Sequence, residues 1–401
     1  MKRFIIIVLD GFGIGAMDDV AEVRPQDIGS NTAKHLLEHG KNINFSTILK
    51  LGLINAMGEV VGDFSFQEHT TVGRSLLAHY GADTFFGHQE IMGTAPKLPK
   101  KQRLAEKIEP LIMDLKQQGY QVEIHEQDQL QLLCVNQGIF IGDNLETDLG
   151  QAINVTGSLE LHSFAEIKAV GELVRRHFEV PRIIAFGGEG VTLDNLKNAI
   201  RIRDGHIGVD APKSGVYNQG YQVVHLGYGV DPTEQVPYVI NQQQIPTHLY
   251  GKVADIVSNP FGKVFPGVDT KMVMDELISD LKTPQSGFYC LNVQETDLAG
   301  HALDSDRYID RLNIADQGIA QVMELMQKED VLVVMADHGN DPTATSSQHS
   351  REKVPLLIHK NGLSSTNLGT RKTMADVGAT VADYFGTKIS FGTSFLDNLN
   401  A

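Results

Sequence analysis

The sequence predicts an α/β protein built on a mostly parallel β-sheet, with a smaller α/β domain inserted into the first. Three observations support this fold class. Short apolar runs alternate with segments of helical periodicity, as in layered α/β folds. Acidic residues and histidines follow three of the runs, and open α/β sheets bind ligands at the carboxyl ends of their strands. Two segments rich in proline, glycine and lysine interrupt the alternation.

The clearest strands are mostly apolar runs, which are typical of strands buried on both faces of a parallel sheet. These strands are expected at residues 4–9, 287–293, 331–335 and 354–359. Helical patterns lie at residues 272–281, 308–326 and 371–384. The run at 4–9 follows Lys2 and Arg3, but it is too short for a signal peptide or a membrane span. We therefore expect a buried strand there and a soluble protein.

An inserted domain is predicted from two hinge-like segments, residues 93–101 and 208–215. Each contains the triplet Ala-Pro-Lys close to a glycine, and such residues are rare inside regular elements. Between the hinges the alternation resumes, with strands expected at 121–125, 131–135 and 182–186 and a helix at 163–176. We expect a core of residues 1–96 and 214–401 and an inserted domain of residues 97–213. The alternative is a single large sheet with long excursions.

The composition excludes some function classes. The chain has 401 residues, of which 41% are hydrophobic, and its formal net charge is −16. Such an acidic balance argues against a nucleic-acid or membrane partner. A small anionic substrate stays compatible with it, because a bound divalent metal inverts the local field. The two cysteines, Cys134 and Cys290, cannot form a disulfide framework, which favours a cytoplasmic location. The composition predicts no particular oligomeric state.

The glycines after the first expected strand are similar to a dinucleotide-binding pattern. Gly11, Gly13 and Ala16 match G-x-G-x-x-[GA]. A Rossmann unit continues through a helix to a second strand that ends in an acidic residue about 20 residues on, whereas residues 31–40 have a helical pattern. Asp10 precedes the glycines, and its carboxylate would repel a pyrophosphate. We expect instead a tight turn that lets the backbone approach another kind of site.

The expected strand ends carry carboxylates and imidazoles in a pattern suited to metal binding. The candidate ligands are Asp10, Asp297, His301, Asp337, His338 and His349. Alone, such a histidine is usually a surface residue and such an aspartate a helix cap, but these two roles do not account for all six. Imidazole with carboxylate suits Zn or Mn, and six ligands can hold two ions. Two ions can clamp the attacking and leaving oxygens of a phosphoryl transfer.

The loop of residues 81–90 contains the candidate nucleophile, Thr84. We expect this threonine at the start of a turn or helix, where free backbone N–H groups favour an anion. Its hydroxyl can ionise near neutral pH only with a metal ion beside it. The alternative interpretation is a threonine that caps a helix.

Together these motifs resemble those of the phosphopentomutases, a family of the alkaline phosphatase superfamily. The matching segments are residues 8–15, 83–84, 87–93, 251–256, 336–343, 349–352, 354–357, 376–383 and 392–396. The resemblance implies an alkaline-phosphatase-like core that is rich in metal ligands. It also implies a mobile cap domain inserted after the nucleophile loop.

The resemblance further implies two divalent ions, with Mn²⁺ favoured and Zn²⁺ or Mg²⁺ as alternatives. One ion would be held by Asp10, Asp337 and His338, next to Thr84, and the other by Asp297, His301 and His349. Thr84 would carry a phosphoryl group and pass it between two oxygens of a sugar phosphate. Lys252 would contact a phosphate. Arg203, with Arg201, is the nearest match to the basic substrate-binding segment of the cap.

Four departures from the family pattern affect the expected substrate. Residues 87–90 are Gly-His-Gln-Glu where the family has Gly-His-Trp-Glu, and Phe86 replaces the second threonine of its Asp-Thr-x-Thr loop. The spacing from Asp297 to His301 is one residue shorter and matches the cofactor-independent phosphoglycerate mutases. Leu159 stands where the cap has its sugar-binding acid. We expect Phe86 and Gln89 to alter the wall near the nucleophile, and ribose 5-phosphate to be a poor substrate.

The favoured hypothesis is a cytoplasmic dimetal phosphomutase, an isomerase that acts on a plain or modified sugar phosphate. The alternative is a metal-dependent phosphatase on the same fold, in which water completes the reaction. A catalytically silent ligand-binding relative conflicts with the complete set of metal ligands. A dinucleotide-dependent oxidoreductase conflicts with the failed context of the glycine pattern.

Overall fold

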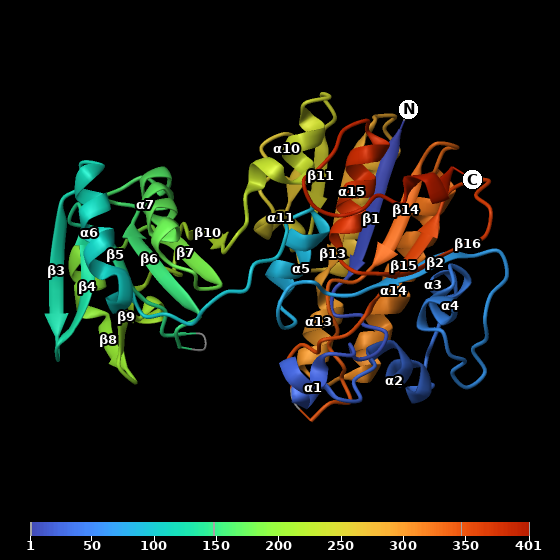
Figure 1. Ribbon diagram of the computed structural model, residues 1–401, viewed down its shortest axis with the longest axis horizontal. Helices are drawn as coiled ribbons and strands as arrows, with labels where there is room; N and C mark the ends of the chain where they lie inside the picture. Colours follow the sequence, from blue (N-terminus) through green and yellow to red (C-terminus); the bar gives the residue numbers. More distant parts are fainter. Residues whose placement is uncertain (1, 147–148, 346, 401) are drawn as a thin grey trace. The chain divides into compact units, whose positions relative to one another are not determined.

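The computed structural model describes residues 2–146, 149–345 and 347–400. The chain divides into two compact units, Met1–Pro96 with Asp231–Ala401 and Lys97–Val230 (Figure 1). The larger unit contains an eight-stranded sheet, and the smaller unit contains a six-stranded sheet and a two-stranded hairpin. Both units therefore have the α/β character that the sequence predicts.

The eight-stranded sheet has the strand order β12-β11-β13-β1-β14-β15-β2-β16. Its strands are β1 (Arg3–Leu9), β2 (Thr71–Ser75), β11 (Thr247–Tyr250), β12 (Val264–Phe265), β13 (Gly287–Val293), β14 (Val331–Met335), β15 (Val354–His359) and β16 (Thr366–Arg371). Only β15 runs antiparallel to its neighbours; the other pairs are parallel. The expectation of a mostly parallel sheet is confirmed.

The central strands β1, β13 and β14 are buried along their whole length, because helices cover both faces of the sheet. Their apolar runs fit this position. Arg3, the first residue of β1, is also buried, and its guanidinium binds the Asp330 carboxylate before β14, with Nε donating to Oδ2 at 2.8 Å. This ion pair joins the amino ends of β1 and β14.

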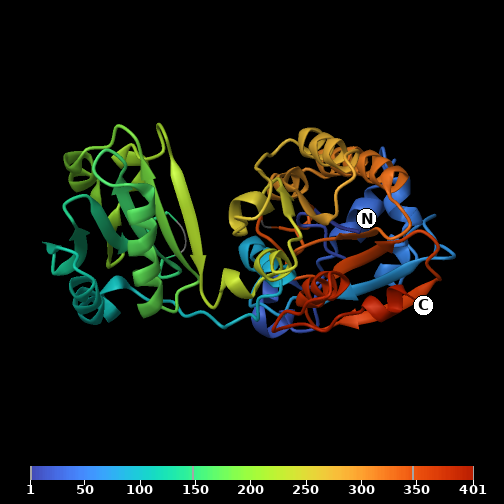
Figure 2. The ribbon, with the colours of Figure 1, turned by 90° about the horizontal axis from the view of Figure 1, so that it is seen from above.

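Two helix layers enclose the large sheet (Figure 2). On one face lie α12 (Thr270–Leu281) and α14 (Ser305–Leu325), and on the other α5 (Thr84–Ile91), α10 (Val236–Asn241) and α15 (Ala375–Tyr384). The helices expected at 272–281 and 308–326 are present. The helix expected at 371–384 begins only at Ala375, because Arg371 ends β16, which pairs with β2. The larger unit also contains α1 (Val20–Val23), α2 (Thr32–His39), α3 (Ser46–Lys50), α4 (Leu53–Met57), α11 (Val253–Ile256) and α13 (Gln294–His301).

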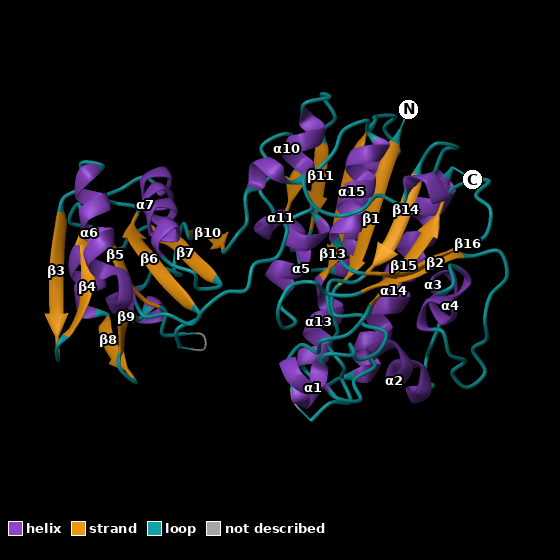
Figure 3. Ribbon diagram, in the orientation of Figure 1, coloured by secondary structure: helices purple, strands orange, loops and turns teal. Residues whose placement is uncertain are grey.

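The smaller unit has the strand order β10-β7-β6-β5-β4-β3 (Figure 3). Its strands are β3 (Val122–Gln127), β4 (Leu130–Val135), β5 (Ile139–Asp143), β6 (Ala152–Ser158), β7 (Arg182–Gly188) and β10 (Gln222–Gly227). Helices α6 (Ile108–Gln117) and α7 (Phe164–His177) cover one face. The hairpin of β8 (Ile200–Arg203) and β9 (His206–Val209) covers part of the other, where Gly142 and Gly208 touch.

The predicted boundary at residues 213 and 214 is wrong. Residues 214–230 belong to the smaller unit, because β10 pairs antiparallel with β7 over Gln222–Gly227. The segment 208–215 is not a hinge either: it contains the end of β9 and the short helix α9 (Ala211–Ser214), which Asp210 caps. The other short helix of this unit is α8 (Leu193–Asn198). The first boundary, after Pro96, is where the two units divide.

The glycine pattern after β1 does not open a Rossmann unit. The next strand along the chain among the described residues is β2, which begins at Thr71. Gly11 has a φ of +76°, and a Cβ on it would lie 2.9 Å from Cβ of Asn340. The glycine turn thus brings the backbone close to a polar loop.

In the described part of the chain, no helix is both long and apolar enough to cross a bilayer.

Candidate metal centre

All six predicted metal ligands lie at one edge of the large sheet, where the parallel strands β1, β13 and β14 end. In the sheet register, Leu9 pairs with Val293 and Val8 with Met335, so the next residues along each strand emerge together. Asp10 follows β1, Asp297 and His301 lie in α13 directly after β13, and Asp337 with His338 follow β14. Because β15 runs antiparallel to β14, β15 begins at the edge where β14 ends. That arrangement brings His349 to the same place.

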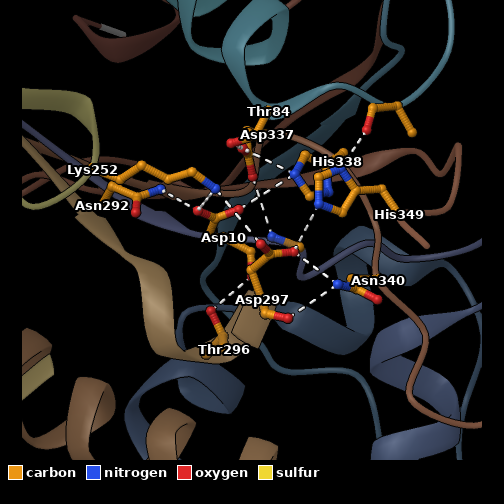
Figure 4. Close-up of polar contacts among 12 residues, drawn as sticks. Asp10, Thr84, Lys252, Asn292, Thr296, Asp297, Asp337, His338, Asn340 and His349 are labelled. Carbon is orange, nitrogen blue, oxygen red and sulfur yellow. Dashed lines mark hydrogen bonds and ion pairs between the residues drawn. The ribbon is translucent and has the colours of Figure 1, made fainter. Parts of the chain in front are cut away.

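The ligands form two groups of three, each with donor atoms within 4.8 Å of one another. The Asp10 triad is Asp10, Asp337 and His338 (Figure 4). The Asp297 triad is Asp297, His301 and His349. In the Asp10 triad, all side chains are fully buried, and His338 Nε2 lies 3.3 Å from a carboxylate oxygen of each aspartate. In the Asp297 triad, Asp297 and His301 are four residues apart on one face of α13. There, His349 Nε2 lies 3.3 Å from Asp297 Oδ1 and 3.0 Å from His301 Nε2.

Backbone carbonyls orient all three imidazoles in the same way. His338 Nδ1 donates to Gly339 O at 3.0 Å, and His349 Nδ1 donates to Ala82 O at 2.8 Å. His301 Nδ1 donates to Ser347 O. Each Nε2 is therefore left facing the carboxylates. Metal-binding histidines in proteins are held in this way, with one ring nitrogen on a backbone carbonyl or carboxylate.

The charges of the centre fit divalent cations. Burial opposes the ionised form, but the pKa values of Asp297 and Asp337 lie well below the ordinary range, because neighbouring imidazoles stabilise their carboxylates. Burial also opposes the imidazolium of His338, yet Asp337 and Asp10 raise the pKa of His338 to about 10. Asp10 Oδ1 and His338 Nε2 are buried, with no hydrogen-bond partner among the described residues. Buried ligand atoms that take part in no hydrogen bond, together with a concentration of carboxylates, are the conditions under which proteins bind metal ions.

Thr84 is the first residue of α5, at the edge of the Asp10 triad. The Asp83 side chain caps the helix by accepting from Phe86 N at 3.0 Å. Thr84 is thus not the capping residue, and its Oγ1 donates to Asp337 Oδ2 at 2.7 Å. The hydroxyl is half-buried and lies at the positive end of the helix dipole, where an anion is stabilised.

Lys252 lies in the same centre, at the start of α11. Its Nζ is 3.1 Å from Asp10 Oδ2 and 3.6 Å from Asp297 Oδ2, so this lysine bridges the two triads. Burial opposes its charge, but the aspartates of both triads raise the pKa of Lys252 above its ordinary value. Its ammonium is therefore a fixed positive charge at the centre.

Two residues of the predicted site have other surroundings. Arg203 is on β8 of the smaller unit, exposed, with Nη1 donating to Leu145 O at 2.9 Å. Gln89 does not line the nucleophile, contrary to expectation: it is buried, donates to Ile256 O at 2.7 Å and accepts from Gln235 Nε2 at 2.6 Å. Gln89 thus joins α5 to the segments around α10 and α11, which is a packing role.

Sequence reasoning missed three residues that position the ligands. Asn292 Nδ2 donates to Asp10 Oδ2 at 3.1 Å and lies 3.0 Å from His88 Nε2. His88 Nδ1 in turn donates to Thr84 O at 2.9 Å. Asn340 Nδ2 donates to Asp297 Oδ1 at 2.8 Å. A buried asparagine inside an otherwise apolar strand was the available signal for Asn292. His88 could have been found four residues after Thr84 on the same helix face.

A family model described as the metalloenzyme superfamily matches residues 2–389. The chain belongs to the metalloenzyme superfamily. The chain is 29% identical over 425 residues to a phosphopentomutase of Lachnoclostridium phytofermentans, covering 99% of each protein. It is 27% identical over 420 residues to a phosphopentomutase of Clostridium kluyveri, covering 100% of each. Among solved structures, a phosphoglycerate mutase of Leishmania mexicana matches with a TM-score of 0.41 and 12% identity, covering 98% of this chain and 97% of that one.

These comparisons confirm the resemblance to phosphopentomutases and the expectation of a metal-dependent enzyme. The family model matches nearly the whole chain, including both units. The six candidate ligand residues all belong to the larger unit.

Proposed function

We propose that this metalloenzyme is a phosphomutase that moves a phosphoryl group between two oxygens of a small phosphorylated sugar, by way of a phosphothreonine at Thr84. The observation that carries the proposal is the hydrogen bond of 2.7 Å from Thr84 Oγ1 to Asp337, a member of the Asp10 triad. It combines a hydroxyl, a helix N-terminus and a metal-ligand set at one point. The full-length relatives named phosphopentomutase support a pentose phosphate or a related compound as substrate.

Two divalent ions are part of the proposal, one held by the Asp10 triad and one by the Asp297 triad. The mixed carboxylate and imidazole ligands favour Mn²⁺, with Zn²⁺ and Mg²⁺ as alternatives. When bound, the ions supply Lewis-acid stabilisation of the attacking and leaving oxygens.

The residues of the chain prepare the transfer. Asp337 Oδ2 accepts from the Thr84 hydroxyl and so fixes the direction of its oxygen. His88 and Asn292 connect the Thr84 backbone to Asp10, which fixes the start of α5 relative to the triad. Phospho-Thr84 gives its phosphoryl group to a substrate oxygen, so that one O–P bond forms as the Thr84 O–P bond breaks. The resulting bisphosphate returns its other phosphoryl group to Thr84, which completes the isomerisation.

Two basic residues are proposed to bind phosphate groups of the substrate. Lys252 does so from within the centre, where its ammonium is flanked by Asp10 and Asp297. Arg203 is assigned the same role from the smaller unit, which we propose to act as the cap over the bisphosphate. A cap keeps water out while the intermediate turns round.

The experiment that tests this function is a panel of phosphosugars with the Mn²⁺-loaded enzyme, in which isomerised products and free phosphate are measured separately. Intact-mass analysis after incubation with a sugar bisphosphate should show one added phosphate on the wild type and none on Thr84→Ala. The exposed Thr283 provides a matched control, since Thr283→Ala should incorporate phosphate normally. Release of free phosphate without isomerised product would identify a phosphatase instead.

Within this panel we expect ribose 5-phosphate to be a poor substrate. Leu159 directly follows β6 and packs partly buried on the core of the smaller unit, so it offers no hydrogen bond to a sugar hydroxyl. A hydroxyl buried against an apolar side chain costs roughly 1–3 kcal/mol. Turnover of ribose 1-phosphate with a kcat/KM above about 10⁴ M⁻¹s⁻¹ would contradict this expectation.

A further inference from the structure

A third group of metal-binding side chains lies in the smaller unit, on the hairpin of β3 and β4. This hairpin triad consists of Glu123, His125 and Cys134, with one donor atom from each within 4.8 Å of the others. It shares no residue with the two triads of the larger unit. Neither the phosphoryl transfer proposed above nor the family resemblance uses it.

The strand register explains why these three side chains meet. Glu123 on β3 lies directly opposite Cys134 on β4, and opposite residues of an antiparallel pair project to the same face. His125 is two residues along β3 from Glu123, so it projects to that face as well. Phe140 on β5 lies opposite Cys134 in turn, and its ring centroid is 5.6 Å from that of His125. The Phe140 ring and the three side chains of the hairpin triad therefore lie on one face of the sheet.

Burial gives the hairpin triad an inner and an outer side. Cys134 is only 1% exposed, and His125 Nε2 is shielded from solvent without a hydrogen-bond partner among the described residues. Glu123 is exposed, so its carboxylate can rotate toward an ion. Ligand atoms around a tetrahedral zinc ion lie roughly 3.3–3.8 Å apart, so closure from the separation in the structure needs only small side-chain rotations.

The chemistry of the donors selects the class of ion. A thiolate with an imidazole favours zinc and other thiophilic ions, whereas Mg²⁺ and Ca²⁺ prefer sites made of oxygen ligands, and this triad has only one carboxylate. Three protein ligands leave one position for water. Binding breaks the Cys134 S–H bond, forms a sulfur–metal bond and releases one proton to solvent, without any change in oxidation state.

We propose that Glu123, His125 and Cys134 bind a zinc-class divalent cation that fastens the edge strand β3 to β4. The position of β3 explains why a bound ion would stabilise this hairpin. β3 is the outermost strand of the six-stranded sheet and has a neighbour on one side only (Figure 3). The turn that joins it to β4 places Asp128 and Gln129 at φ values of 50° and 64°, a left-handed conformation that non-glycine residues adopt at a cost. An ion bound by residues of both strands would hold β3 to its single neighbour at the end of the hairpin away from this turn.

Cobalt(II) is the probe that tests this site, because a cobalt–thiolate bond has a near-ultraviolet charge-transfer band that oxygen and nitrogen ligands do not produce. The chain contains two cysteines, and the other one, Cys290, is fully buried within β13. The full-length protein is titrated with CoCl₂ in the presence of a non-thiol reductant. We expect the thiolate band in the wild type and in Cys290→Ala, and its loss in Cys134→Ala.

Zinc analysis gives a second, independent measurement. Cys134→Ala should bind one zinc ion fewer per chain than the wild type and Cys290→Ala. Glu123→Gln alters an exposed residue and leaves the fold intact; it should weaken cobalt binding at this site by more than about tenfold, since even an outer partner of a metal ligand is worth that much. The proposal is overturned if the wild type develops no thiolate band at saturating cobalt. It is equally overturned if the band persists in Cys134→Ala.

Discussion

At the scale of single residues, the geometry of the candidate metal centre depends on side chains outside the two triads. Asn340 is the clearest case, because its Nδ2 donates to both Asp297 Oδ1 and Asp297 O, at 2.8 and 3.1 Å. Its own Cβ is fitted against Gly11, where any side chain would collide. The orientation of the Asp297 carboxylate is thus set by a neighbour from a different segment of the chain.

Asn340→Ala should therefore weaken Mn²⁺ binding without removing a ligand. An outer partner of a metal ligand is typically worth about 10–100-fold in metal affinity, and we expect a loss in this range. Isothermal titration with MnCl₂ measures it. Asn361→Ala, at an exposed position on the same unit, is the control and should bind Mn²⁺ like the wild type. Equal affinities of the two variants would show that Asn340 does not orient Asp297.

Lys252 should act in opposite directions on cations and anions. Its ammonium lies 3.1 Å from Asp10 Oδ2, so Lys252→Met removes a positive charge that opposes metal binding. We expect Mn²⁺ affinity to rise by at least about tenfold, equivalent to about 1.4 kcal/mol. Binding of inorganic phosphate should fall by a similar factor, and calorimetry follows both ligands. The exposed Lys282, changed to Met, is the control. A parallel loss of metal and phosphate binding would contradict a phosphate-binding role for Lys252.

At the scale of elements, α5 connects Thr84, the proposed nucleophile, to the packing of the larger unit. Thr84 begins the helix, and Glu90 in its last turn is buried. The Glu90 carboxylate accepts five hydrogen bonds, from Ala78 N, His79 N, His79 Nδ1, Thr373 Oγ1 and Met374 N. These bonds tie the carboxyl end of α5 to the segment after β2 and to the segment before α15. The helix that presents Thr84 is thereby fixed from its far end.

Glu90→Gln should destabilise the folded protein by about 3–5 kcal/mol, because it breaks a buried pair with His79 and leaves polar groups unpaired. Burial raises the pKa of Glu90, but the bonds from His79 and Thr373 outweigh it, and the net shift is below the ordinary value of 4.5. A carboxyl group whose pKa is lower in the folded state than in the unfolded state stabilises the fold at pH values above its unfolded pKa. This stabilisation is lost as the pH falls through the pKa of the folded state. The difference between wild type and Glu90→Gln should therefore shrink below about pH 4.5.

Urea unfolding across this pH range measures the effect of Glu90→Gln. Glu324→Gln, on the exposed side of α14, should change the free energy of unfolding by less than about 0.5 kcal/mol. If the free energies of unfolding of the wild type and Glu90→Gln differ by the same amount at every pH, the ionised Glu90 carboxylate contributes no pH-dependent stability.

At the scale of the whole molecule, the smaller unit is a continuous segment with its own sheet and core. We predict that a fragment of residues 97–230 folds alone and unfolds cooperatively in urea. A fragment of residues 97–213 lacks β10, and with it the strand that pairs with β7 over six residues. It should show a lower unfolding midpoint or no cooperative transition. Identical transitions of the two fragments would mean that β10 contributes nothing to this fold.

The strands of the two sheets differ in how far the sequence predicts them. The strands at 287–293, 331–335 and 354–359 were found because apolar runs this dense occur where both faces are buried. β10 was missed because Gln222–Gly227 is only partly buried and lacks such a run, so its pairing with β7 is decided by the tertiary fold. The six candidate metal ligands, which the structure brings together in two triads, were predicted because carboxylates and imidazoles that follow buried strands share no purely structural role. Asn292, Asn340 and the hairpin triad depend on strand register, which no local pattern contains.

The order of the ligands along the chain has a consequence for protein synthesis. Asp10 emerges from the ribosome long before the Asp297 triad, which is complete only after His349. The smaller unit is finished at Val230, and domains generally fold as units while the chain grows. At 5–20 residues per second, roughly 6–24 s pass between these two points. During that interval the nascent protein carries one finished domain, while the candidate metal ligands after Asp10 are still being synthesised. Assembly of the Asp10 and Asp297 triads therefore follows the synthesis of the smaller unit.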